Sequence, residues 1–406
     1  MYMHSNIILP GLEEAIILQT EVREEQYIIH FEMPVVAQTC PSCQTQTTRI
    51  HDYRWTKLKH LKFGERMTTL FYRRRRYSCS CKKRFPEKNS IVERYQRFSK
   101  EWNKMAQIRS VKAKSFTEIA MQYGTSVSTI IRRFDRIVPT SIKGKTSLPS
   151  VIAIDEFKGN AGNEKFQLIV ADAITKEPID ILPNRKKETI ETYLRAHGAN
   201  VEMVVMDMSH SFKAAVQNTL NKPLIIADRF HFVRYIYWAM DRVRVRIQKE
   251  WHDYDRKKVK RKRHVFFKKP KDLTENDRWY LERYFNLSEE LREAYKLKEQ
   301  FCQWFEQAKQ NGGEKIEETK KLLVNFYEEV ERSGIVEFQR SVKTLQNWQT
   351  EILNSFAFGY SNGFVEGLNN LTKVIKRNAF GFRRFDRLRA KILLTHQFKK
   401  IGNEIG

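Results

Sequence analysis

The sequence predicts a multidomain α+β protein, and three observations lead to this fold class. Four of the five cysteines fall within residues 40–81, which indicates a small metal-binding module. A helix-turn-helix pattern follows at residues 115–136. Two apolar runs that each end in an aspartate, at residues 151–155 and 204–207, then belong to a region of alternating strand-like and helix-like segments. We therefore expect two small modules ahead of a larger α/β domain.

Charge and hydropathy limit the choice of partner. The 406 residues include 74 Lys and Arg against 48 Asp and Glu, which gives a formal net charge of +26. Such an excess predicts a polyanionic partner, and nucleic acid is the usual one. An anionic membrane surface is the alternative, but no apolar run reaches the roughly 18 residues of a membrane span, and no signal peptide begins the chain. We expect a soluble, cytoplasmic protein with no membrane partner.

The N-terminal part predicts strands and a zinc site. Residues 1–36 are expected to form a β lead-in, because they contain two β-prone runs separated by a charged turn region. Residues 37–92 are expected to form a zinc-binding module with four thiolate ligands, Cys40, Cys43, Cys79 and Cys81. Between the two cysteine pairs, basic residues alternate with aromatic ones, so this module is also predicted to contact DNA through Arg73, Arg74, Arg75 and Arg76. The alternatives are free thiols, or a zinc ion that only stabilises the fold.

Residues 93–140 are predicted to be a helix-turn-helix domain. Ser115 and Glu118 have the spacing of a capping box, and Gly124 provides the turn. The buried face of the second helix is expected at Val127, Ile130 and Phe134. The residues expected to face outward and contact DNA are Ser128, Thr129, Arg132 and Arg133. An ordinary helical hairpin is the alternative, and a linker is expected at residues 137–150.

Residues 149–235 predict the first part of an α/β domain. Strands are expected at residues 151–155, 166–172, 179–182, 203–207 and 224–227, with helices at residues 187–197 and 212–220. This order of elements is typical of the RNase H-like fold, in which the first and fourth strands are neighbours. Asp155 and Asp207 would then lie together at one edge of the sheet. Paired carboxylates at the ends of buried strands indicate a divalent metal site.

The remaining chain is predicted to be largely helical. Residues 236–352 are expected to form an α-helical insertion. Most of its charges can be explained as a solvated helix face, but the basic run at 256–263 is explained less well in this way. Residues 353–406 are expected to complete the catalytic domain with a helix that includes Glu366. On that helix, Phe364, Leu368 and Ile375 are expected to be buried. Glu366 and the predicted DNA-binding residues would occupy another face, namely Asn370, Lys373 and Arg377.

Together these segments resemble the ISL3 family of bacterial insertion-sequence transposases. The most specific similarities are the Ala227–His231 segment and the stretch from Ser361 through Glu366 to Arg377. The resemblance implies a DDE triad on Asp155, Asp207 and Glu366, together with an all-helical insertion before the glutamate. One difference from the family is that a single residue, Ser80, separates the second pair of cysteines.

The chemistry that this resemblance implies is two-metal DNA strand cleavage. The three carboxylates would hold two Mg²⁺ ions for hydrolysis at the transposon end and for strand transfer into target DNA. Asp228, Arg229 and His231 are expected to be active-site accessories. The expected partners are the terminal inverted repeats and target DNA, bound by a homodimer or a larger assembly in a nucleoid-associated complex.

Two other interpretations remain open at this point. The first is a zinc-finger and helix-turn-helix regulator that binds DNA without cutting it. That interpretation explains the charge and the N-terminal third, but it does not explain the aspartates at the strand ends. The second is a different RNase H-like nuclease or integrase, which the upstream helix-turn-helix disfavours.

Overall fold

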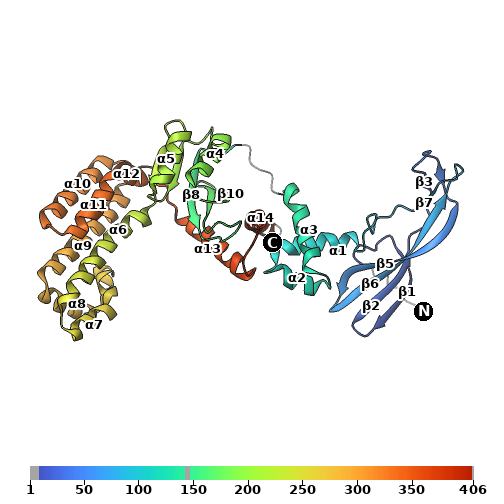
Figure 1. The fold of residues 1–406 in the computed structure, drawn as a ribbon, viewed down its shortest axis with the longest axis horizontal. Coiled ribbons are helices and arrows are strands. Elements are labelled where there is room, and N and C mark those ends of the chain that lie inside the picture. Colours follow the sequence, from blue (N-terminus) through green and yellow to red (C-terminus); the bar gives the residue numbers. More distant parts are fainter. Residues whose placement is uncertain (1–8, 142–146, 405–406) are drawn as a thin grey trace. The chain divides into compact units, whose positions relative to one another are not determined.

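The computed structural model describes residues 9–141 and 147–404, and it contains two compact units. The first unit comprises residues 1–143, 377–380 and 390–406, and the second comprises residues 144–376 and 381–389. Mixed α and β structure, with many helices, is visible along the chain in Figure 1.

A five-stranded sheet begins the first unit. Its strands are β1 (Ile16–Arg23), β2 (Gln26–Glu32), β5 (Ile50–Phe63), β6 (Arg66–Ser78) and β7 (Arg84–Pro86), in the order β1-β2-β6-β5, with β7 also paired to β6. The expected β lead-in contains a hairpin, because β1 and β2 pair antiparallel. This hairpin is part of a larger sheet, since β2 also pairs in parallel with β6. A small second sheet consists of β3 (Gln38–Thr39) and β4 (Gln46–Thr47).

Helices complete the first unit. They are α1 (Lys100–Lys112), α2 (Phe116–Gln122), α3 (Val127–Ser141) and the later part of α14 (Phe385–Glu404). Trp102, Ile119 and Ile130 form a buried core between α1, α2 and α3. The Lys391 ammonium of α14 donates hydrogen bonds to three carbonyl groups at the end of α1. Helix α3 continues to Ser141, into the segment predicted to be a linker, and residues 142–146 of that segment lie outside the described residues.

The second unit contains a mixed sheet of five strands. These strands are β8 (Val151–Phe157), β9 (Gln167–Asp172), β10 (Pro178–Leu182), β11 (Met203–Met206) and β12 (Leu224–Ala227), in the order β10-β9-β8-β11-β12. Strands β8, β11 and β12 are parallel, whereas β9 and β10 are antiparallel to their neighbours. The predicted adjacency of the first and fourth strands is confirmed by the β8–β11 pairing.

Helices account for most of the second unit after β12. Helices α4 (Lys187–His197) and α5 (His210–Thr219) connect the strands, as predicted. The later helices are α6 (Arg229–Ile247), α7 (Asp253–Arg261), α8 (Glu275–Leu287), α9 (Glu289–Asn311), α10 (Ile316–Ser333), α11 (Val336–Asn347), α12 (Gln349–Ala357) and α13 (Gly363–Asn378), with short 3-10 turns at Gln248–Glu250, Arg263–Phe266 and Pro270–Asp272.

These helices and the sheet share one hydrophobic core. It extends from Ile152 and Ile154 on β8 to Phe301 and Trp348 in the helical part. Helix α12 packs on β12, where the Asn354 amide donates a hydrogen bond to the carbonyl of Ile225 at 2.8 Å. None of the helices in the described ranges combines the length and apolar character of a membrane span.

Candidate active site and metal centres

Three aspartates line one edge of the sheet in the second unit. Asp155 lies near the end of β8, while Asp207 and Asp228 come directly after β11 and β12. Ala153 is paired with Val205, and Met206 with Ala227. Continuing both registers places Asp155, Asp207 and Asp228 level with one another across three parallel strands. The carboxyl ends of neighbouring parallel strands are where ligands bind in sheets of this kind.

The electrostatics of this row suit a bound cation. Burial is the largest cause that raises the pKa of Asp155 to about 7, and the neighbouring Asp207 and Asp228 carboxylates contribute to the same shift. Burial, together with Glu156 and Asp228, raises the pKa of Asp207 to about 6. The pKa of Asp228 is also raised, mainly by burial. Each shift reflects negative charges that lack sufficient compensation, which is the condition that a divalent cation relieves.

Two asparagines around α13 hold this row in place. The Asn369 side chain donates a hydrogen bond to Asp155 Oδ2 at 2.7 Å, and the backbone N–H of Glu156 donates to Asp155 Oδ1 at 2.8 Å. The backbone N–H of Asn362 donates to Asp228 Oδ1 at 3.4 Å, and its side-chain amide donates to the carbonyl of Ile154. Neither hydrogen bond was predicted from the sequence. Asn369 is only 6% exposed.

A test of whether these residues fit a metal ion comes from Asp207. Its Oδ1 atom is buried and has no hydrogen-bond partner among the described residues. A buried carboxylate oxygen without a partner is costly, so this atom is suited to coordinate a cation. Glu366 is exposed in the first turn of α13, and its charge contributes to the raised pKa of Asp228. Among the described residues, no three carboxylates have ligand atoms within 4.8 Å of one another, so the row is open rather than closed around a small ion.

The predicted accessory residues lie in different surroundings. His231 Nε2 is 3.8 Å from Asp228 Oδ2, and burial lowers the pKa of this histidine to about 4, so the ring is neutral near pH 7. The Arg229 guanidinium instead donates to the carbonyl of Ser355 and lies over the Phe356 ring, 4.9 Å from its centroid. Arg229 therefore connects α6 to α12, and Asp228 is an equal member of the aspartate row.

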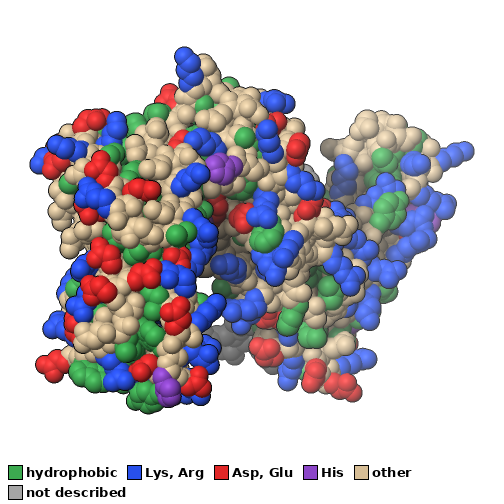
Figure 2. Space-filling view, turned by 60° about the vertical axis from the view of Figure 1, so that its left-hand side comes forward, with side chains coloured by type: hydrophobic (Ala, Val, Ile, Leu, Met, Phe, Trp, Pro, Cys, Tyr) green, Lys and Arg blue, Asp and Glu red, His purple; other side chains and the backbone are tan. Residues whose placement is uncertain are grey.

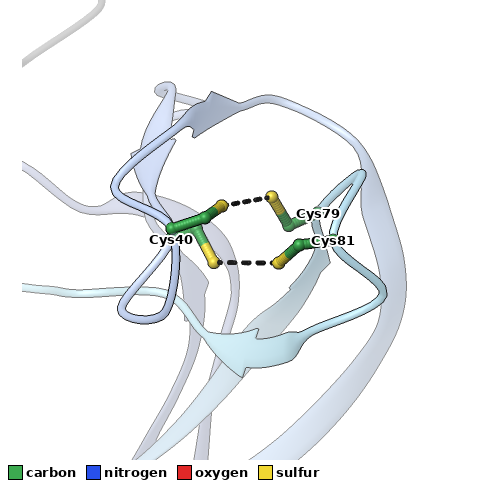
Figure 3. A group of neighbouring side chains, drawn as sticks. Cys40, Cys79 and Cys81 are labelled. Carbon is green, nitrogen blue, oxygen red and sulfur yellow. Dashed lines mark hydrogen bonds between the residues drawn. The ribbon is translucent and has the colours of Figure 1, made fainter.

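The four predicted cysteine ligands come together in the first unit. The sulfur atoms of Cys40, Cys43, Cys79 and Cys81 all lie within 4.8 Å of one another (Figure 3). The Cys40–Cys81 distance is 3.7 Å and the Cys43–Cys79 distance is 3.4 Å. A tetrahedral zinc ion about 2.3 Å from each sulfur requires sulfurs about 3.8 Å apart, so the cluster fits zinc. The side-chain hydrogen bond between Cys43 and Thr45 contributes most to lowering the pKa of Cys43 to about 6, which favours the thiolate that binds metal.

The backbone explains how the close Cys79–Cys81 pair can share a metal with the Cys40–Cys43 pair. Each pair lies in a tight turn next to a residue with positive φ, Gln44 at 61° and Lys82 at 63°. The N–H of Gln44 donates to the carbonyl of Cys40, and the N–H of Lys82 donates to the carbonyl of Cys79. Both turns therefore direct their thiols toward the same point.

Helix α3 presents a narrower outward face than the sequence predicted. Ser128 and Arg132 are exposed, as expected, and Arg136 extends the same face one turn further. The expectation that Thr129 and Arg133 face outward is wrong, because they are only 7% and 5% exposed. Thr129 forms hydrogen bonds with Ser126, the residue before the helix. The Arg133 guanidinium donates hydrogen bonds to the side chains of Asn103 and Gln96. Val127, predicted to be buried, is 36% exposed.

The four arginines of β6 also differ in exposure. Arg75 is 1% exposed and forms ion pairs with Glu32 at 3.0 Å and with Glu87 at 3.4 Å. The prediction that Arg75 contacts DNA is therefore wrong, because its guanidinium is buried and paired with these two carboxylates. Arg73, Arg74 and Arg76 are partly exposed. On the face drawn in Figure 2, Lys and Arg side chains cover more of the surface than Asp and Glu, in keeping with the net charge of +26.

Helix α13 presents the three predicted DNA-binding residues to solvent. Asn370, Lys373 and Arg377 are all exposed and recur at intervals of three and four residues, which places them on one face. Lys373 donates to the side-chain oxygen of Asn370 at 3.3 Å. The opposite face is buried through Val365, Leu368, Asn369, Thr372 and Ile375.

Comparisons with known proteins give a consistent result for three segments. A family model described as a transposase of the ISL3 type matches residues 152–392, more than half of the chain. A model for the zinc-finger of transposase IS204/IS1001/IS1096/IS1165 matches residues 37–81. A model for the helix-turn-helix domain of transposase family ISL3 matches residues 87–138. A curated relative, the transposase for insertion sequence element IS1001 from Bordetella parapertussis, is 24% identical over 371 residues, which cover 85% of each chain.

Proposed function

This chain belongs to the ISL3 family of transposases, and from that premise we propose that it binds the terminal inverted repeats of its insertion sequence and cuts and joins DNA at their ends. The proposed reactions are phosphodiester hydrolysis at the element end and strand transfer into target DNA. The observation that supports them best is the row of Asp155, Asp207 and Asp228 across β8, β11 and β12. A non-catalytic DNA-binding regulator has no use for three carboxylates with raised pKa values at one sheet edge.

The proposed fold of the catalytic domain is RNase H-like. Two features support this assignment: the strand order β10-β9-β8-β11-β12, and the antiparallel-to-parallel change at β8. The helical segment from α6 to α12 would then be the insertion between the second aspartate and the glutamate.

Asp155, Asp207 and Glu366 would hold two Mg²⁺ ions, with Asp228 as a further carboxylate beside them. When bound, these ions supply Lewis-acid activation of the attacking oxygen and stabilisation of the leaving 3′ oxygen. The donor set suits magnesium, which prefers carboxylate oxygens. The unpaired Oδ1 atom of Asp207 is the clearest place for such a ligand bond.

The protein groups around the carboxylates would orient them. The Asn369 side chain donates to one oxygen of Asp155, and the backbone N–H of Asn362 donates to one oxygen of Asp228. His231 is neutral near pH 7 and accepts a hydrogen bond from Arg234 at Nδ1, so its Nε2–H is the group that lies 3.8 Å from Asp228 Oδ2. Exposed Asn370, Lys373 and Arg377 would hold the phosphates of the strand to be cut.

The first unit would recognise the DNA end. Helix α3 is proposed to enter the major groove with Ser128, Arg132 and Arg136, while the zinc module contacts the backbone through Arg73, Arg74 and Arg76. Because two ends must be joined, we expect at least a dimer on DNA.

The test is strand cleavage of a duplex that includes the element's own end, in Mg²⁺ and in EDTA. Wild type should nick the end only with the metal. Asp207→Asn should reduce nicking at least 100-fold, because removing one metal-binding carboxylate disables the two-metal site. Gel-shift affinity for the same duplex should stay within about two-fold, since Asp207 lies in the second unit.

A matched control is Asp272→Asn, because Asp272 is an exposed acid of the second unit, in the 3-10 turn Pro270–Asp272, outside the aspartate row. This variant should cleave like wild type. Specific binding without cleavage by wild type in Mg²⁺ or Mn²⁺ would overturn the catalytic proposal and favour the regulator.

A further inference from the structure

The sheet of the first unit exposes a cluster of aromatic rings. Strand β5 leaves Trp55 55% exposed and Tyr53 43% exposed on the face opposite the buried Leu58. Hydrophobic stabilisation is proportional to the area buried, so rings left half exposed contribute only about half of what full burial would give. Of this face, the proposed function uses only Arg73.

Strand pairing brings further rings and two cations to the same face. Trp55 lies opposite Arg73, and Lys57 lies opposite Phe71, across the β5–β6 pair. His30 of β2 lies beside Phe71, with stacked rings 5.0 Å apart and 9° from parallel. We call these residues the aromatic face: His30, Tyr53, Trp55, Lys57, Phe71 and Arg73.

The cations of this face lie against rings. The Arg73 guanidinium is 4.1 Å from the centroid of Tyr53, and the Lys57 ammonium is 5.8 Å from that of Phe71. Trp55 and His30 form a T-shaped pair with ring centroids 5.6 Å apart, and Trp55 remains 55% exposed. Flat rings interleaved with cations form the type of surface on which nucleobases stack.

Neighbouring carboxylates weaken phosphate binding at this face, so a contact of Arg73 with phosphate would not by itself hold a ligand there. Glu32 lies 3.6 Å from Arg73, and Glu21 lies 3.4 Å from His30. Duplex DNA would offer the face mainly phosphates, because its base faces are stacked on one another. Unpaired bases offer their flat faces, which an exposed indole can reach.

We propose that the aromatic face binds unpaired DNA by stacking its bases on Trp55 and Tyr53. The occupant is a stretch of single-stranded DNA, such as strand breakage or local melting at an element end would release. The inference rests on the proposed function for the source of that DNA. The inference goes beyond the proposed function by assigning the aromatic face a ligand other than duplex DNA.

The experiment compares two labelled oligomers by fluorescence anisotropy with the full-length protein. One is oligo(dT) of about eight nucleotides, and the other is an abasic oligomer of equal length with the same phosphates. Wild type should prefer oligo(dT). Trp55→Ala should weaken oligo(dT) binding by at least about five-fold, the loss of about 1 kcal/mol expected for one stacked base. Affinity for the abasic oligomer should stay unchanged.

Two further variants separate stacking from general effects. Trp55→Phe keeps a flat ring and should restore most of the affinity for oligo(dT). Trp279→Ala removes an indole of similar exposure, 57%, from α8 of the second unit and should have no effect. The proposal fails if wild type binds both oligomers equally, if Trp55→Ala weakens both equally, or if Trp279→Ala has the same effect as Trp55→Ala.

The outcome is separable from that of the proposed function. Duplex-end cleavage by wild type, with no preference for oligo(dT), would overturn this inference alone. Preference for oligo(dT), with no cleavage of the duplex end, would overturn the catalytic proposal alone.

Discussion

The side-chain amide of Asn369 donates a hydrogen bond of 2.7 Å to Oδ2 of Asp155, although 214 positions separate the two residues. The bond joins α13, the helix of Glu366, to β8. Asn369 is 6% exposed, so its amide has little freedom to rotate away. This contact sets the orientation of the Asp155 carboxylate beside Asp207.

We predict that Asn369→Ala lowers strand cleavage by about 10- to 100-fold, the usual cost of losing a group that orients a metal ligand. Affinity for the duplex end should change little, because Asn369 is buried. Cleavage should recover in part at high Mg²⁺ concentration, since a misoriented carboxylate binds the ion more weakly. The measurement is cleavage rate against Mg²⁺ concentration, with exposed Asn347→Ala on α11 as control. Equal rates for wild type and Asn369→Ala at all Mg²⁺ concentrations would refute the role.

The raised pKa of Asp155, about 7, predicts how the stability of the metal-free protein depends on pH. An unfolded aspartate titrates near 3.9, so between about pH 4 and 7 the native state binds more protons than the unfolded state. The contribution of Asp155 to the free energy of unfolding is therefore fully present below about pH 4 and is lost as the pH rises through about 7.

Asp155→Asn cannot ionise, so without metal it should be more stable than wild type at about pH 8 and lose most of this advantage at about pH 5. Adding Mg²⁺ at the higher pH should stabilise wild type but not the variant. Thermal unfolding of both proteins in EDTA and in Mg²⁺ measures the difference. A stability difference that does not vary with pH would contradict the assignment of this pKa.

The strands and their aspartates could be predicted because the local pattern is strong. Apolar runs bounded by turn residues locate β8, β11 and β12, and helix α4 was predicted with the bounds Lys187–His197 that the structure has. The adjacency of β8 and β11 followed from the order of the elements. Asp228 also ends a strand, so the same pattern could have ranked it with Asp155 and Asp207.

The burial of charged side chains could not be predicted in the same way. Arg75 appears within a run of four arginines, yet Glu32 and Glu87 from other segments enclose it. Arg133 follows the exposed Arg132, but its partners Asn103 and Gln96 lie outside its own helix. Such partners are close only after folding, so a pattern along α3 or β6 contains no signal for them.

The cysteine cluster predicts one zinc ion per chain. Cys40→Ser should abolish zinc binding, because Cys40 is buried with its sulfur 3.7 Å from that of Cys81. The segment around β3 and β4 should then exchange amide hydrogens faster, since a two-stranded sheet of this size is not stable alone. Zinc content by metal analysis and hydrogen exchange provide the measurement. Cys302→Ser is the matched control, because Cys302 lies in the second unit, and it should keep a full zinc content. Unchanged zinc content in Cys40→Ser would rule out this site.

Helix α3 has exposed and buried arginines close together, so substitutions there can distinguish contact with DNA from structural support. Arg132→Ala and Arg136→Ala remove exposed cations, and each should weaken binding of the specific duplex by about 10-fold and lower its salt dependence. Arg133→Ala removes a 5% exposed guanidinium that bonds to Asn103 and Gln96, so it should lower the thermal stability of the first unit instead. Anisotropy titrations over a salt series, together with thermal unfolding, distinguish the two effects. If Arg133→Ala lowered the salt dependence as much as Arg132→Ala while leaving stability unchanged, Arg133 would have to face the DNA, contrary to its burial here.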